Sequence, residues 1–299
     1  MADPISWLWV PATVIGAAAQ TARNAMQRHL TAELGTLGAT SVRFIYGFPF
    51  GLVLLAIASL LAGAAPPLPS GEAVLWIAIG AATQIAGTAF QLSAMRLKAF
   101  ALAVAYAKTE PILIVAFAFV ALGEALSPAG LAAILVATAG VIAMSGNPLR
   151  NGVDGRATLY GIAAGAGFGI SAVCYRGGIL ALDALSFFLG ATTALAVALF
   201  LQAAAMIAWF AVRDRATLAK VFAAWRRSGF AGLMGACASA GWFSGFALAP
   251  AALVRTLALV EVFFSMLVGR NLMAQRLTRA EAFGLVLIVA GVAALLLFG

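Results

Sequence analysis

Charged side chains are scarce in this chain. Asp, Glu, Lys and Arg make up 9% of its residues, against about 25% in a typical soluble domain. Apolar residues make up 64%, against a usual share of about 45–50%. So few charges cannot cover the surface of a folded domain in water, and the composition therefore excludes an ordinary soluble protein.

Histidine and cysteine are also scarce. The one histidine, His29, lies in a predicted basic loop, and Cys174 and Cys237 lie inside predicted helices. A metal site needs clustered Cys, His or carboxylate side chains, and covalent catalysis needs a nucleophile beside a base. The sequence offers neither, nor a glycine-rich loop followed by a lysine that would hold a nucleotide. We therefore expect no metal, no cofactor and no enzyme activity.

Long apolar runs recur from one end of the chain to the other. Each is long enough to cross about 30 Å of hydrocarbon as a helix. The runs are apolar on all faces, whereas the strands of a membrane barrel alternate polar and apolar residues, and helices satisfy their own backbone in lipid. The sequence predicts an all-α integral membrane protein with ten transmembrane helices, at about residues 5–27, 38–62, 72–95, 99–122, 128–146, 157–180, 184–212, 226–249, 251–270 and 280–298.

The cations gather on one side of the predicted membrane. The loops after the odd-numbered spans hold nearly all of them, whereas the opposite loops hold Asp3, Glu72, Glu124 and Asp183 with one cation, Arg176. The positive-inside rule makes the basic side cytoplasmic, so both termini are expected outside the cytoplasm. The net charge of +8 then indicates loops facing anionic lipid, not nucleic acid. We expect a monomer in a bacterial-type inner membrane, with the lipid bilayer and a small solute as its partners.

An internal repeat relates the two halves of the chain. Residues 99–145 align with residues 250–296 without a gap, which pairs Glu110 with Glu261 and Gly140 with Gly291. Each half has five predicted spans, an odd number, so the halves enter the membrane in opposite senses. The acidic turn at Glu124 accordingly aligns with a basic turn at 274–276. We predict two inverted five-helix repeats, residues 1–150 and 151–299, with a site near the midplane between them.

Several motifs resemble a known family. Thr109-Glu110-Pro111, then 122–128 (LGEALSP), then the Gly140-Val141 span resemble the EamA-type signature of the drug/metabolite transporter superfamily, and Arg43-Phe44 is similar to it as well. The second half departs from the signature, with Val262 in place of the proline. The resemblance covers the whole chain and implies a transporter of amino acids or other metabolites, similar to the YddG-type amino-acid exporters.

Charged residues inside the predicted spans need a role, because a charge at the bilayer centre costs at least about 2.5–3.5 kcal/mol. For Lys108 and Arg255 two alternatives stay open: they face a central cavity and bind a substrate carboxylate, or they brace helices by pairing with glutamates. For Arg43, Glu110 and Glu261 we favour the bracing role. Glu110 is expected to pair with Arg43, Lys108, Arg255 or backbone amides.

Uncharged polar residues share helix faces in several spans and could line a pocket, as amide and hydroxyl groups beside aromatic walls suit an amphipathic solute. Bonding between helices is the competing explanation. The predicted substrate-binding residues are Gln20, Asn24, Gln84, Tyr106, Lys108, Ser239, Trp242 and Arg255.

The sequence thus predicts a secondary transporter that exports amino acids, including aromatic ones, or similar metabolites by alternating access. A passive facilitator or channel is the alternative, and an integral-membrane enzyme is less well supported. Proton coupling and uniport both remain open.

Overall fold

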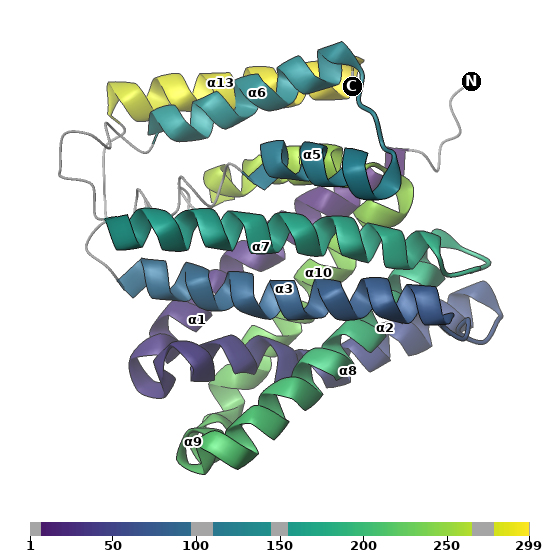
Figure 1. Ribbon diagram of the computed structural model, residues 1–299, viewed down its shortest axis with the longest axis vertical. Helices are drawn as coiled ribbons and strands as arrows, with labels where there is room; N and C mark the ends of the chain where they lie inside the picture. Colours follow the sequence, from purple (N-terminus) through teal and green to yellow (C-terminus); the bar gives the residue numbers. More distant parts are fainter. Residues whose placement is uncertain (1–6, 97–109, 145–154, 265–277, 299) are drawn as a thin grey trace. The chain divides into compact units, whose positions relative to one another are not determined.

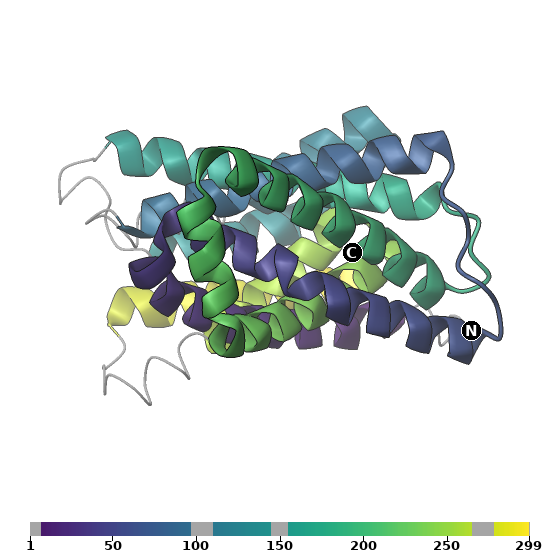
Figure 2. The same ribbon diagram turned by 90° about the horizontal axis from the view of Figure 1, so that it is seen from below.

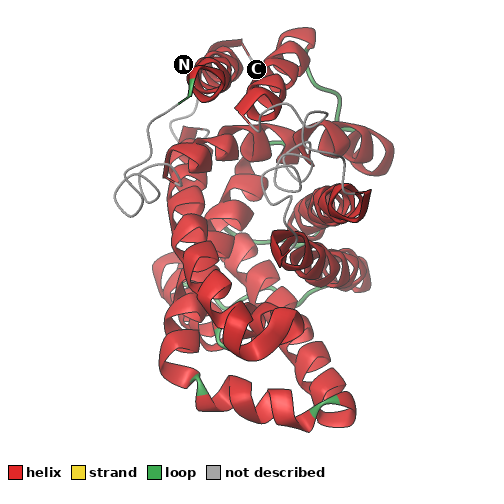
Figure 3. Cartoon of the chain, turned by 90° about the vertical axis from the view of Figure 1, so that its left-hand side faces the viewer, coloured by secondary structure: helices red, strands yellow, loops and turns green. Residues whose placement is uncertain are grey.

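The structure is a computed structural model that describes residues 7–96, 110–144, 155–264 and 278–298. Helices account for nearly all of these residues, and no strand occurs among them (Figure 3). The helices are α1 (Trp9–Ile45), α2 (Gly47–Ala62), α3 (Gly71–Arg96), α5 (Glu110–Leu122), α6 (Pro128–Met144), α7 (Gly155–Leu180), α8 (Phe187–Arg213), α9 (Arg215–Ala223), α10 (Trp225–Leu248), α11 (Ala251–Leu257), the 3₁₀ turn η2 (Ala258–Val260) and α13 (Arg279–Phe298) (Figure 1).

The expected all-helical membrane fold is confirmed at this level. Five helical stretches in the described part of the chain are long and apolar enough to cross a membrane, and three shorter apolar helices accompany them. The long stretches are His29–Ala62, Gly71–Ala94, Thr158–Leu180, Phe187–Arg213 and Trp225–Leu248; the shorter ones are Glu110–Leu122, Pro128–Met144 and Ala282–Phe298.

The break expected between residues 27 and 38 is present but much shorter than predicted, because α1 consists of two helical stretches that meet at Gly35. The backbone of Gly35 is not helical, and its φ of 71° favours glycine. The Gln27 side chain crosses the bend, donating from Nε2 to the carbonyl oxygen of Ala39 at 2.9 Å. Polar residues such as Glu33 end the apolar run but not the helix. Hydropathy indicates which residues can lie in lipid, whereas helix propensity is a separate property, and Glu is a good helix former.

Polar residues at the expected turns begin several helices. The Ser70 hydroxyl accepts a bond from the Ala73 amide, and the Ser127 hydroxyl accepts one from the Gly130 amide. Ser186 caps α8 in the same way. These oxygens satisfy amides that have no partner within the first helical turn.

The described helices group into two compact units that do not coincide with the two halves of the chain. Unit 1 contains residues 1–85 and 174–249, and unit 2 contains residues 86–173 and 250–299. Each unit therefore takes segments from both predicted repeats, and α3 and α7 each contribute to both units. The predicted repeats 1–150 and 151–299 were defined by similarity within the sequence, not by contacts in the fold, and they stay a prediction.

Unit 1 is held together by close contact between α1 and α10. A Cβ added to Gly241 would lie 2.5 Å from the Ala12 carbonyl oxygen and 2.9 Å from the Gly16 amide nitrogen. The two backbones can approach this closely only because glycine has no side chain. Gly51 in α2 likewise makes room for Leu199 of α8, 2.8 Å from where a Cβ would stand.

Unit 2 is organised around α6 and α13, which lie side by side (Figure 1). A Cβ on Gly140 would lie 2.6 Å from the Gly284 carbonyl oxygen, and one on Gly291 would lie 2.8 Å from the Ala133 carbonyl oxygen. Next to this crossing, Ala137, Val141, Leu259 and Ile288 form a buried apolar cluster. Small residues thus set the helix spacing in both units.

Candidate functional site

Three polar side chains from three helices of unit 1 meet in its interior. The Tyr175 hydroxyl of α7 donates to Oε1 of Gln84 in α3 at 3.1 Å. Gln202 of α8 donates from Nε2 to the same Gln84 oxygen at 2.8 Å and to the Tyr175 hydroxyl at 3.1 Å. We call Gln84, Tyr175 and Gln202 the amide–tyrosine cluster.

Small residues on the neighbouring helix position the tyrosine ring. A Cβ on Gly80, one turn before Gln84, would lie 2.9 Å from the Tyr175 ring. On its other side the ring packs on Phe243 of α10, with 4.4 Å between ring centres. Tyr175 is 1% exposed and Gln202 is 1% exposed, whereas Gln84 is half-buried. The ring is thus fixed between α3 and α10 with its hydroxyl directed at the two amides.

The cluster has more acceptors than its central amide has hydrogens. Gln202 Nε2 carries two hydrogens, yet it lies within bonding distance of Gln84 Oε1, the Tyr175 hydroxyl and the Ala81 carbonyl oxygen, the last at 3.3 Å. At most two of these acceptors can take a hydrogen from Gln202 at one time. The hydrogens of Gln202 are therefore shared among the three acceptors.

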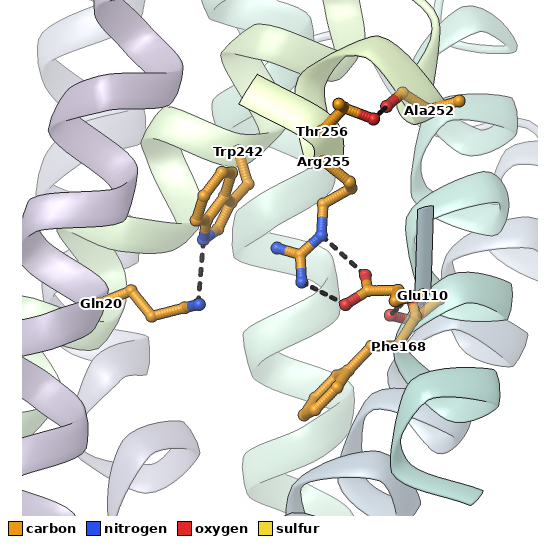
Figure 4. Close-up of polar contacts among 8 residues, drawn as sticks. Gln20, Glu110, Phe168, Trp242, Ala252, Arg255 and Thr256 are labelled. Atoms are coloured by element: carbon orange, nitrogen blue, oxygen red, sulfur yellow. Dashed lines mark hydrogen bonds and ion pairs between the residues drawn. The ribbon is translucent and has the colours of Figure 1, made fainter. Parts of the chain in front are cut away.

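A second polar group in unit 1 joins α1 to α10. The Trp242 indole donates from Nε1 to Gln20 Oε1 at 3.2 Å (Figure 4). One turn further along α1, Asn24 Oδ1 accepts from Arg23 Nη2 at 2.8 Å. Ser239, three residues before Trp242, is 4% exposed.

Two arginines of α1 are buried in unit 1. Arg23 is 2% exposed and Arg43 is 4% exposed. Both lie against Gly235 of α10, since a Cβ there would be 3.4 Å from Arg23 Cδ and 3.7 Å from Arg43 Cβ. The Arg43 guanidinium also lies 5.1 Å from the centre of the Phe44 ring. These arginines give the interior of unit 1 a positive character.

Unit 2 contains a buried ion pair. Arg255 of α11 donates from Nε and Nη2 to the two carboxylate oxygens of Glu110 in α5, at 2.6 and 2.7 Å (Figure 4). The two side chains are 13% and 6% exposed. This two-bond geometry is the strongest that a guanidinium and a carboxylate can form. Of the partners predicted for Glu110, the structure places Arg255 on it.

The predicted site residues thus fall into separate groups. Unit 1 holds Gln20 with Trp242, Asn24 with Arg23, and Gln84 in the amide–tyrosine cluster, together with Ser239 and Arg43. Unit 2 holds Arg255 with Glu110, and the 6%-exposed Glu261. Tyr106 and Lys108 lie outside the described residues.

Sequence reasoning missed Gln202 and Arg23. Arg23 lies near the end of a predicted span, and it shares a helix face with Gln20 and Gln27, three residues before it and four after. That spacing was the available signal for burial. Gln202 is the one amide side chain in the predicted run 184–212, which also could have marked it.

The described residues contain no group of three or more His, Cys, Asp or Glu side chains that could hold a metal ion. Cys174 is buried, Cys237 is half-buried, and neither forms a disulfide. The chemistry available in the polar groups of both units is hydrogen bonding and charge pairing.

Comparison with known proteins shows the fold alone. No known family's profile matches the chain, and no curated protein matches it. A solved structure described as "Crystal structure of protein" superposes with a TM-score of 0.67 at 21% sequence identity. The match covers 97% of this chain and 99% of the other. The chain therefore adopts a fold already seen in a solved structure over nearly its whole length.

Proposed function

We propose that this protein is a secondary membrane transporter that exports small metabolites, amino acids first among them, by alternating access. The observation that carries the proposal is the amide–tyrosine cluster. Burying amides and a hydroxyl is costly unless they are hydrogen-bonded, and these three side chains bond one another within helices that are otherwise apolar. Gln84, Tyr175 and Gln202 offer donors and acceptors beside the Phe243 ring, which suits a solute with polar and apolar parts.

Helix packing supports the inverted repeat that such a mechanism needs. The sequence repeat pairs Ala133 with Gly284, and Gly140 with Gly291. Under that pairing the approach of Gly140 to the Gly284 oxygen becomes the approach of Gly291 to the Ala133 oxygen. Both occur, since a Cβ added to Gly140 would lie 2.6 Å from the Gly284 oxygen and one added to Gly291 would lie 2.8 Å from the Ala133 oxygen. A reciprocal relation of this kind is what a two-fold axis between α6 and α13 produces.

A second pair of crossings joins helices that are equivalent under the repeat, although the residues at the two crossings are not paired one to one. In unit 1 the Gly241 position faces the Ala12 oxygen and the Gly16 nitrogen, four residues apart. In unit 2 the Gly87 position faces the Ala164 oxygen and the Phe168 nitrogen, at 3.3 and 3.2 Å. The first crossing joins predicted spans one and eight, and the second joins spans six and three, which the repeat makes equivalent. Ten spans in two inverted repeats are the organisation that we propose.

The substrate class rests on the resemblance to drug/metabolite transporters of the EamA type. In that reading Gln20, Asn24, Gln84, Ser239 and Trp242 line the pathway. For Arg255 the ion pair with Glu110 favours the bracing alternative, because both carboxylate oxygens already occupy its guanidinium. A passive facilitator is the alternative function, and an enzyme is not proposed.

Transport by the purified protein in liposomes tests the proposal. A panel of labelled amino acids is presented with and without a pH gradient, and exchange against unlabelled solute is measured. We expect saturable uptake and exchange for at least one amino acid, with a weaker affinity in Gln202→Leu. Thr83→Val, on the same helix as Gln84, is the matched control, because the Thr83 hydroxyl bonds its own helix backbone. Unsaturable flux without exchange would indicate a facilitator, and no flux for the whole panel would contradict the proposed substrate class.

The proposed orientation has its own test. A reporter tag at Asp3 is expected to lie outside the cytoplasm, and one in the 213–227 segment inside it. The reverse result would overturn the orientation in the inner membrane without affecting the transport proposal.

A further inference from the structure

The connection between α8 and α10 carries a dense set of cations. Arg213, Arg215, Lys220, Arg226 and Arg227 all lie within residues 213–227, and all are exposed. The acid within this stretch is Asp214, whose carboxylate accepts the Thr217 amide at 3.0 Å and the Thr217 hydroxyl at 2.6 Å at the start of α9. The segment therefore keeps a strong net positive charge.

Insertion of α8 and α10 into a membrane would bring this segment to its surface. Both α8 and α10 are long and apolar enough to span the membrane, so the short piece between them must lie where they emerge. Figure 2 shows α9 running across the ends of α8 and α10 and not along them. At 1.5 Å per residue, its nine residues extend about 13 Å along that surface.

One face of α9 is fixed to α1. Val221 is 0% exposed, and its carbonyl oxygen accepts a bond from the Tyr46 hydroxyl at 3.1 Å. Thr217 and Val221 also pack around Gly38, where a Cβ would lie 3.2 and 3.8 Å from their methyl carbons. With this face held by α1, the Lys220 side chain on α9 remains exposed.

Exposed aromatic rings flank the cations. Trp209 is 53% exposed and Trp225 is 59% exposed, and Phe222 lies between them in sequence at 48%. The Arg213 guanidinium lies 5.7 Å from the centre of the Trp209 ring, and that of Arg226 lies 5.4 Å from the Trp225 ring. Exposed tryptophans mark the headgroup level of a membrane, so the two guanidinium groups are held at the depth of lipid phosphates.

Not every cation of the segment takes part. Arg227 is engaged by Glu33 of α1 at 3.2 Å, and Arg215 donates from Nε to the Ala211 carbonyl oxygen at 2.8 Å. The group best placed for a partner outside the protein is Arg213, Lys220 and Arg226, all of them exposed. We name Arg213, Lys220 and Arg226, with Trp209 and Trp225, the α9 headgroup surface.

We propose that the α9 headgroup surface binds the headgroups of anionic phospholipids in the leaflet that it faces. Guanidinium and ammonium groups pair with phosphate oxygens, and the adjacent tryptophans rest between headgroups and acyl chains. The surface recruits anionic lipid around α8, α9 and α10 in preference to zwitterionic lipid. This inference depends on membrane insertion and does not depend on the proposed transport function.

Tryptophan quenching by brominated lipid tests the inference in the full-length protein. The protein is reconstituted into phosphatidylcholine bilayers in which a minor fraction of the lipid is brominated, either as phosphatidylglycerol or as phosphatidylcholine. We expect stronger quenching by brominated phosphatidylglycerol. Trp209→Phe/Trp225→Phe should remove this excess, which assigns it to the two exposed rings. Equal quenching by the two brominated lipids would overturn the proposal.

Charge variants identify the cations responsible. Each cation near an anionic surface favours binding about fivefold, so Arg213→Gln/Arg226→Gln is expected to lower the preference for phosphatidylglycerol roughly 25-fold. Arg156→Gln/Arg279→Gln removes the same charge from other exposed positions and should leave most of the preference intact. Arg213→Lys/Arg226→Lys should retain it, which separates loss of charge from a disturbed fold. An equal loss in the control pair would mean that net charge and not this surface is responsible. Competition by soluble glycerol phosphate at matched concentration would identify a free-anion site and overturn the lipid assignment.

Discussion

The ion pair between Glu110 and Arg255 allows a sharp test of how charge is accommodated in unit 2. Arg255→Met keeps the length of the side chain and removes the guanidinium, which leaves the Glu110 carboxylate without its two bonds of 2.6 and 2.7 Å. Glu110→Gln removes the carboxylate charge and leaves the Arg255 guanidinium without an anionic partner. The double replacement Glu110→Leu/Arg255→Met removes both charges and leaves apolar groups of similar volume.

The expected magnitudes follow from burial. Breaking a buried ion pair by removing one partner costs about 3–5 kcal/mol, because the other charge remains in a medium that solvates it poorly. Replacing both partners with apolar groups is close to neutral or stabilising. We therefore expect each single variant to lose about 3–5 kcal/mol of unfolding free energy and the double variant to recover most of that loss.

Unfolding in mixed micelles of detergent and dodecyl sulfate measures these free energies. The chain supplies its own control in the ion pair of Arg227 with Glu33, whose side chains are 69% and 55% exposed and whose atoms lie 3.2 Å apart. Arg227→Met should cost at most about 1 kcal/mol, because water already solvates both charges. Both pairs join a guanidinium to a carboxylate, so the comparison measures the combined effect of burial and of the two-bond geometry of the buried pair.

Two results would refute the reasoning. If Arg255→Met costs no more than Arg227→Met, the interior of unit 2 solvates a lone carboxylate and the pair is not a brace. If the double variant is as unstable as the singles, packing by the two side chains and not their charge is what unit 2 requires.

Three further predictions concern packing, pH and hydrogen bonding. Gly140→Ala should cost about 1–3 kcal/mol of unfolding free energy, because the added Cβ would lie 2.6 Å from the Gly284 carbonyl oxygen. Gly229→Ala is the control: its surroundings are open, and it should stabilise α10 by about 0.5–1 kcal/mol. Equal effects of the two variants in the same micelle assay would contradict the tight crossing. The pKa of Asp214 lies below its ordinary value because the Thr217 hydroxyl, and then the Thr217 amide, donate to the carboxylate. The ionised Asp214 carboxylate therefore stabilises the start of α9 fully above the ordinary pKa, and this stabilisation is lost as the pH falls through the lowered pKa. Titration of a ¹³C-labelled Asp214 carboxyl should show this, and a midpoint at or above the ordinary value would contradict it. Tyr175→Phe should cost about 0.6–1.7 kcal/mol, the range for hydrogen bonds inside membrane proteins, and should slow uptake in liposomes; unchanged uptake would remove the hydroxyl from the site.

Hydropathy predicted the helices well and their ends less well. The spans predicted at 72–95, 184–212 and 226–249 match α3, α8 and α10 within a few residues. The segment at 28–37 was assigned to a loop, although it continues α1 as far as the bend at Gly35. A window of apolar residues indicates which part of a helix can lie in the hydrocarbon core of a membrane. A helix can extend beyond that part wherever its backbone hydrogen bonds stay satisfied.

Helical spacing predicted which polar residues share a face, but not their partners on other helices. Gln20 was expected near Trp242 only in the sense that both would line a pathway, and the structure joins them directly at 3.2 Å. Gln84 was predicted without Gln202, because partners far apart in sequence depend on how α3 and α8 pack. Arg255 was one of four partners considered for Glu110, and tertiary packing alone selects it.

The composition of the two units sets an order for synthesis. Unit 1 is complete in sequence once Ala249 has been made, whereas unit 2 needs Pro250–Gly299 as well. During translation α1, α2 and the first part of α3 must therefore wait in the membrane for α8 and α10, and α5 and α6 must wait longer, for α11 and α13. Glu110 is synthesised well before Arg255, so the nascent chain carries that carboxylate without its guanidinium partner until the last helices arrive.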